Sequence, residues 1–114
     1  MIRYNPGDVV LVRFPFTDLA AVKKRPALVL SPPEFSDRYD DIVVLAMTSQ
    51  PQPDDQLRVH EWRQAGLPKP TWFKPLIATV ACGIIDRRIG TLQHQDQPRA
   101  VDVIRLLISS RFAS

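Results

Sequence analysis

Short apolar runs that are rich in β-branched residues recur along the first half of the chain. The clearest are "VVLVRF" (9–14), "ALVL" (27–30) and "IVVLAM" (42–47). Each run is too short and too β-branched for a typical helix, so each predicts a strand. Because the runs are almost continuously apolar, we expect these strands to be buried on both faces. The pattern therefore predicts a small closed barrel or a sheet that is covered on each side.

Weaker strand signals follow in the second half. "LRVHEW" (57–62) alternates apolar and polar positions, as a half-exposed strand does. "TWFK" (71–74) and "IATVAC" (77–82) are two further candidates, and "DRRIGTL" (86–92) is typical of a turn followed by a short strand. Most of the eleven prolines lie between the runs, where turn residues are expected. The chain is thus predicted to be mainly β, with five to seven strands.

The last segment, "PRAVDVIRLLISSRF" (98–112), has a different pattern. Its apolar residues recur at helical spacing, and Pro98 stands where a first-turn proline belongs. Asp96, just upstream, is a candidate N-cap. The apolar arc is wide, so the predicted C-terminal helix needs cover on more than one side. Two interpretations stay open: the helix caps one end of a barrel, or it forms the seam of a dimer.

Length and composition narrow the class of protein. With 114 residues, 45% of them apolar and 24% charged, the chain is expected to form one globular domain over residues 1–114. Its one cysteine, Cys82, cannot form an internal disulfide, which favours a reducing cytoplasm. No apolar stretch approaches the roughly 20 residues that a membrane-spanning helix needs. A secretory signal pattern is also missing at the start, so we expect a cytoplasmic protein with no membrane contact.

Charge is unevenly distributed along the chain. The net charge is +3 and the isoelectric point is about 9.4, which permits nucleic-acid binding without establishing it. In "KKRPALVLS" (23–31), three consecutive cations precede an apolar strand. Two interpretations are open for this triplet. It is either the solvated end of a loop or part of a surface that faces a polyanion.

Taken in order, several segments resemble a known family. They are "GDVVLVRFPF", "KKRPALVLS", "IVVLAMTSQ", "GLPKPTWFKPLIATV" and "RRIGTL" before a terminal helix. Together they resemble the MazF/PemK toxin family, and the likeness runs from Gly7 to about Ile108. The resemblance implies a small SH3-like barrel with added short helices, and a homodimer. It also implies a metal-independent endoribonuclease without cofactors, which cleaves single-stranded RNA and is silenced by a cognate antitoxin in a type II toxin–antitoxin system.

The resemblance also assigns candidate site residues. The family's arginine before the second strand corresponds to Arg25, and its hydroxyl at the end of the third strand corresponds to Thr48, beside Ser49. The loop that helps to cover the RNA groove corresponds to about residues 15–24. The candidate RNA-binding residues in it are Phe16, Thr17, Lys23 and Lys24.

The chain departs from the family pattern at two places. Ala20 and Ala21 replace a frequent Glu-Gln pair, and Lys74 and Pro75 replace a frequent Asp-Gln pair on the fifth strand. Metal-free RNA cleavage still needs a group that stabilises the phosphate, a base and an acid. Arg25 suits the first role, because its planar fork of donors matches phosphate oxygens.

The acid and the base are less determined. Lys74 is a candidate acid, and Asp18 is the nearest carboxylate that can act as a base. His60 has a suitable intrinsic pKa, but the orientation of its strand is open. His94 is expected to be solvent-exposed or a local cap. The aromatic residues Trp62, Trp72 and Phe73 can either stack on bases or pack in the core.

Two other functions stay open beside the endoribonuclease. The first is a non-catalytic module of the same fold that binds RNA or an antitoxin. The second is a toxin that acts on a protein, as gyrase-poisoning relatives of the fold do. The chain end "SSRFAS" offers no recognisable site for this last activity.

Overall fold

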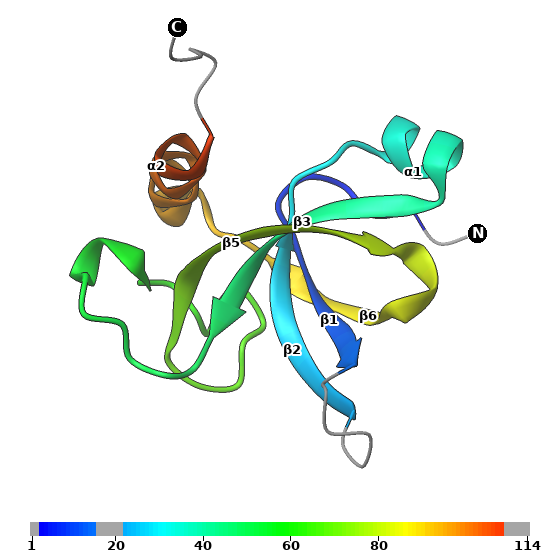
Figure 1. Cartoon of the computed structure of the whole chain (residues 1–114). Helices are drawn as coiled ribbons and strands as arrows, with labels where there is room; N and C mark the ends of the chain where they lie inside the picture. Colours follow the sequence, from blue (N-terminus) through cyan, green and yellow to red (C-terminus); the bar gives the residue numbers. More distant parts are fainter. Residues whose placement is uncertain (1–2, 16–21, 109–114) are drawn as a thin grey trace, which may run out of the picture.

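The computed structural model describes residues 3–15 and 22–108, and these residues form one curled antiparallel sheet (Figure 1). The order of its strands is β4-β5-β3-β2-β1-β6, and every pairing is antiparallel. The strands are β1 (Asp8–Pro15), β2 (Val22–Val29), β3 (Asp41–Thr48), β4 (Arg58–Val59), β5 (Thr71–Ala81) and β6 (Ile85–Thr91). The prediction of a mainly β fold with five to seven strands and a C-terminal helix is confirmed.

Helical segments lie around the sheet. The C-terminal helix α2 (Gln97–Leu107) begins with Pro98 in its first turn, as predicted, and Ile108 already has extended backbone. The predicted helix therefore ends earlier than expected, and residues 109–112 lie outside the described part. Helix α1 (Pro33–Tyr39) was not predicted. The three 3-10 helices are η1 (Asp55–Leu57), η2 (Cys82–Ile84) and η3 (His94–Asp96).

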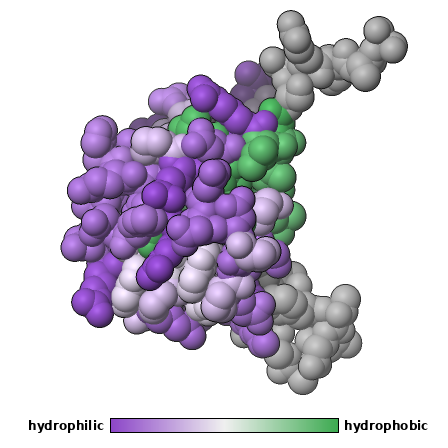
Figure 2. Space-filling model, turned by 90° about the vertical axis from the view of Figure 1, so that its left-hand side faces the viewer, coloured by the Kyte–Doolittle hydropathy of each residue, from purple (hydrophilic) through white to green (hydrophobic). Residues whose placement is uncertain are grey.

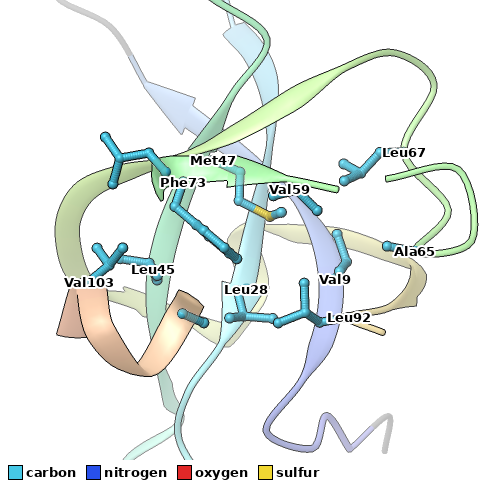
Figure 3. Packing of buried hydrophobic residues seen from close by; sticks show 12 residues of the cluster. Val9, Leu28, Leu45, Met47, Val59, Ala65, Leu67, Phe73, Leu92 and Val103 are labelled. Carbon is cyan, nitrogen blue, oxygen red and sulfur yellow. The ribbon is translucent and has the colours of Figure 1, made fainter. Parts of the chain in front are cut away.

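Two apolar clusters occupy the two faces of the central strands. The first lies inside the curl, where Phe73 and Met47 point toward Leu28 and α2 contributes Val103 (Figure 3). The second lies on the opposite face and includes Val10 of β1. Because neighbouring residues of a strand point to opposite faces, β1, β2 and β3 are buried on both sides. The prediction drawn from their continuous apolar runs is confirmed.

Three sequence-based expectations about the strands need correction. Lys23, Lys24 and Arg25 do not precede the second strand; they are part of it and pair with β1. The segments 71–74 and 77–82 form one strand, β5, which continues through Pro75. The predicted strand 57–62 is reduced to the two residues of β4.

A buried carboxylate explains why β4 is so short. Asp96 is completely buried, and its two carboxylate oxygens accept hydrogen bonds from the backbone N–H groups of His60 at 2.9 Å and Glu61 at 2.8 Å. These N–H groups are thus bound to the start of α2 instead of a neighbouring strand. Asp96 does occupy the N-cap position of α2, as expected, but its side chain caps nothing in that helix.

The loop between β4 and β5 is fixed against β6 by two glycines. Gly66 has a φ of +88°, and a Cβ atom placed on it would lie 2.0 Å from the carbonyl oxygen of Ile89. A Cβ atom on Gly90 would lie 1.9 Å from the carbonyl oxygen of Ala65. The two backbones therefore approach at a distance that only glycine permits on both sides. We call this contact the glycine crossing.

Candidate functional site

A cleft of about 240 Å³ lies where β2 separates from β3. It collects residues from β1, β2, the end of β3 and the loop before β5. They are Leu11, Lys24, Arg25, Pro26, Thr48, Ser49, Leu67, Pro68, Lys69 and Thr71. Four residues that the sequence singled out, Lys24, Arg25, Thr48 and Ser49, therefore lie around one cleft.

Pro26 explains why the sheet opens here. The backbone groups of a strand alternate between its two neighbours, and the Leu30 N–H donates to the Val43 carbonyl of β3 at 2.8 Å. The nitrogen of Pro26, four residues earlier, therefore also points toward β3 but carries no hydrogen. The β2–β3 ladder accordingly begins only at Ala27, opposite Ala46.

The same register brings the two main candidates together. Continued by two residues beyond the Ala27–Ala46 pair, it sets Arg25 opposite Thr48 across the gap. On its other side Arg25 pairs with Val12 of β1, and its side chain is half-buried. A rigid strand therefore holds Arg25 at the cleft.

Thr48 and Ser49 end β3 at the cleft. The side chain of Thr48 is buried, and its hydroxyl oxygen accepts a hydrogen bond from the Gln50 N–H at 3.1 Å. Thr48 is thus a turn residue and a cleft residue at once. Because a hydroxyl accepts and donates, the Thr48 proton is still available for a ligand oxygen.

Lys69 was missed by sequence reasoning, although it lines the cleft. It stands between Pro68 and Pro70 in the loop after the glycine crossing, and its carbonyl accepts a hydrogen bond from the Thr71 hydroxyl at 2.8 Å. The signal in the sequence was "LPKP", where two prolines restrict the backbone on either side of the lysine.

Lys74 does not line this cleft. The β3–β5 register passes from Leu45–Ile77 directly to Met47–Phe73, so Ala46 faces a bulge that contains Lys74. The bulge turns Lys74 outward, where its side chain is exposed. Its proposed role as an acid remains a prediction.

Several other candidates lie elsewhere. Phe16, Thr17 and Asp18 fall outside the described residues. His60 and His94 are exposed and do not line the cleft. The aromatic residues belong to the core: Phe73 is completely buried, and Trp62 and Trp72 pack against its cluster.

The cleft has a positive electrostatic character. Among its described lining residues, Lys24, Arg25 and Lys69 are cations and none is a carboxylate. Lys24 also contacts Asp86 of β6, with 3.3 Å between its Nζ atom and a carboxylate oxygen. Hydrogen bonds from Arg13 and Lys24 lower the pKa of Asp86 below its ordinary value, so this acid is ionised at neutral pH.

Two other clefts lie beside α2. One, of about 390 Å³, is lined by η1 and α2 residues such as Leu57, Asp102 and Leu106. The other, of about 320 Å³, lies between α2 and the start of β1 and is mainly apolar. Neither collects cations and hydroxyls as the smaller cleft does, so we place the candidate site at the β2–β3 opening.

The described residues show neither a metal site nor a membrane span. Within residues 3–15 and 22–108, no group of three His, Cys, Asp or Glu side chains is placed to hold a metal ion. In the same part of the chain, no helix is long and apolar enough to cross a bilayer.

A family model described as a PemK-like, MazF-like toxin of a type II toxin–antitoxin system matches residues 5–108. The chain belongs to this family. The expected resemblance is thereby confirmed. A search of curated protein sequences finds no match to this PemK/MazF-family chain.

Solved structures share the fold at low sequence identity. A toxin MazF-mt6 from Mycobacterium tuberculosis has a TM-score of 0.70 at 19% identity, over 88% of this chain and 94% of that one. A MazE–MazF structure from Deinococcus radiodurans has a TM-score of 0.77 at 15% identity, covering 94% and 96%. An endoribonuclease in complex with its cognate antitoxin, from a mycobacterial species, has 0.70 at 13%, covering 94% of each chain.

Proposed function

We propose that this toxin-family chain is a metal-independent endoribonuclease that cleaves single-stranded RNA in the β2–β3 cleft. The observation that carries the proposal is the convergence of Arg25, Lys24, Lys69 and the Thr48 hydroxyl around one cleft without a described carboxylate. Such a site favours a phosphate group, because cations and neutral donors stabilise its negative oxygens. The family description, a type II toxin, supports the same function.

Cleavage without a metal uses the substrate's own 2′-hydroxyl. Its oxygen attacks the adjacent phosphorus and gives its proton to a base, while the bond from phosphorus to the 5′-oxygen breaks and that oxygen takes up a proton. The products are a 2′,3′-cyclic phosphate and a 5′-hydroxyl. Negative charge grows on the two non-bridging oxygens, where Arg25 can donate two parallel hydrogen bonds.

The remaining groups are assigned by their positions. Lys69 lies in the cleft, so we assign it, in place of Lys74, the proton that the leaving oxygen takes up. Thr48 or Ser49 donates a further hydrogen bond to the phosphate. Asp18 remains the proposed base.

The test is incubation of the purified protein with a long unstructured RNA in excess EDTA. We expect the parent to release discrete fragments, and Arg25→Ala to cleave about 10²–10³-fold more slowly, as when one donor to a transition-state oxyanion is removed. Arg38→Ala, which removes an exposed arginine of α1, should cleave at the parent rate. Equal cleavage by the parent and Arg25→Ala would remove Arg25 from the mechanism.

The second candidate function is a non-catalytic module that binds RNA or an antitoxin. It is favoured by the replacements at Ala20, Ala21, Lys74 and Pro75. This function predicts a tight, salt-sensitive complex with RNA that remains intact after long incubation.

Two partners besides RNA are part of the proposal. The first is a cognate antitoxin, because related structures contain an endoribonuclease with its cognate antitoxin and MazE with MazF. The second is another copy of this chain. Val101, Leu106 and Ile108 expose 43%, 77% and 59% of their surface, and apolar side chains gather on one side of an otherwise largely polar view (Figure 2).

The dimer is tested by light scattering. An exposed apolar helix face marks an interaction surface, so the parent should have the mass of a dimer at micromolar concentration. Val101→Asp should shift it toward a monomer, whereas Asp102→Ala on the same turn should not. A monomeric parent would contradict this part of the proposal.

A further inference from the structure

Three cations from three different strands meet at one carboxylate beside the cleft. Asp86 of β6 contacts Arg13 of β1 at 3.0 Å, Lys24 of β2 at 3.3 Å and its own neighbour Arg87 at 3.3 Å. Only 14% of the Asp86 side chain is exposed, against 45–65% for the three cations. We call Arg13, Lys24 and Arg87 the Asp86 cation cluster.

The backbone builds this cluster. Between the pairs Leu11–Arg87 and Val12–Ile85, β6 contains one extra residue, and that residue is Asp86. A bulge of this kind redirects a side chain locally. Arg13 and Lys24 are direct partners in the β1–β2 register, so their side chains stand next to each other on the sheet.

Stability alone does not account for this arrangement. Like charges at directly opposite positions of two strands destabilise a sheet, and exposed ion pairs add little that compensates. A single carboxylate also cannot neutralise three cations. Asp86 therefore orders the cluster and leaves it with an excess of positive charge.

The cluster is continuous with the cleft. Lys24 belongs to both, and Leu11, which lines the cleft, pairs with Arg87 on β6. An extended polyanion that leaves the cleft past Lys24 thus meets Arg13 and Arg87 next. Both are arginines, whose planar forks suit phosphate oxygens.

We infer that the Asp86 cation cluster is a second phosphate-contact surface, which binds the backbone of the RNA strand outside the cleavage cleft. This inference rests on the proposed function. Because the contacts are to phosphates, the surface contributes affinity and register and reads no base. An acidic peptide has related charge chemistry, but the surface shares Lys24 with a cleft suited to phosphate, and this favours RNA.

The test compares a long and a short RNA, both uncleavable because their 2′-hydroxyls are methylated. The long one has about 16 nucleotides and the short one about 4, enough for the cleft alone. Binding is measured by fluorescence anisotropy between about 50 and 200 mM salt. The variant is Arg13→Ala/Arg87→Ala, and the matched control is Arg3→Ala, which removes an exposed arginine paired with Asp37.

We expect the double variant to bind the long RNA about tenfold more weakly at low salt. The slope of log affinity against log salt should fall by about 2, since each lost phosphate contact removes about one unit. Affinity for the short RNA, the cleavage rate at saturating unmodified RNA and the melting temperature should match those of Arg3→Ala.

Three results would overturn the inference. The first is parent-like affinity and salt slope for the long RNA in the double variant, with cleavage retained; this leaves the proposed function intact. The second is an equal loss for both RNAs, which would show a general effect on the cleft. The third is unchanged RNA binding with weakened binding of an acidic peptide, which would assign the surface to a protein. A parent that neither binds nor cuts any RNA would overturn the proposed function itself.

Discussion

The glycine crossing makes a sharp prediction about how the cleft is supported. Gly90→Ala would place a methyl group 1.9 Å from the Ala65 carbonyl oxygen and 2.5 Å from its carbon. Ordinary van der Waals contact begins at 3.4 Å, so the two backbones must separate by about 1.5 Å. The loop that moves leads directly to Leu67 and Lys69, which line the cleft.

The cost follows from the rigidity of both partners. Overpacking costs about 1–3 kcal/mol, and contact between two backbones belongs at the upper end of that range. Replacing glycine by alanine returns about 0.4–1 kcal/mol by restricting the unfolded chain. We therefore expect a net loss of about 2 kcal/mol in the free energy of unfolding, or roughly 8 °C in melting temperature for a chain of this size.

The loss of cleavage should exceed the loss of stability. A displacement of about 1 Å at a reacting group can cost about 100-fold in rate. Gly90→Ala should therefore cleave RNA far more slowly even at temperatures where it is fully folded. Thermal melting by circular dichroism and fragment release from RNA measure the two effects separately.

Gly83→Ala is the matched control, because nothing lies within 4 Å of a Cβ atom at Gly83. It should melt within about 2 °C of the parent and cleave at the parent rate. If Gly90→Ala behaves as Gly83→Ala does in both assays, the glycine crossing does not hold the wall of the cleft.

Three further outcomes follow from buried or paired groups. Asp96→Ala leaves the N–H groups of His60 and Glu61 without their acceptor, so urea unfolding should show a loss of about 3 kcal/mol, and Asp96→Asn, which keeps one acceptor, should lose less. Phe73→Ala should lose about 3–5 kcal/mol in the same assay, because Phe73 is completely buried; a loss below that of an exposed-site variant would contradict its place in the core. Hydrogen bonds from its β1 and β2 cations hold the pKa of Asp86 below the ordinary 3.8, so its stabilising effect is complete above that value and is lost as the pH falls through the lowered pKa. Asp86→Asn should accordingly lose less stability than the parent between about pH 5 and pH 2, and identical acid titrations would refute this.

The central strands were predictable because their signal is local. Continuous apolar runs have only one favourable environment, a sheet buried on both faces, and this identified β1, β2 and β3. The pairing of Arg25 with Thr48 at one cleft follows from the same strands, since the end of one and the middle of the next share a register.

Features that depend on distant or weak interactions were not predictable. Helix α1 buries no residue, so it leaves no apolar periodicity to detect. The strand expected at 57–62 is short because Asp96, some 35 residues later, takes the N–H groups of His60 and Glu61. Lys74 is turned outward by a bulge opposite Ala46 that the alternation of "TWFK" does not reveal.

The placement of the supports along the chain has a consequence for synthesis. Arg25, Thr48 and Lys69 leave the ribosome before the residues that fix the cleft wall, since Gly90 and Asp96 come later. Domains fold as units while the chain grows from its N-terminus. A growing chain that stops before Gly90 therefore carries the cleft residues without a cleft. The ribosome that makes this toxin-family protein is thus exposed to a formed cleft only once β6 and the start of α2 have been added.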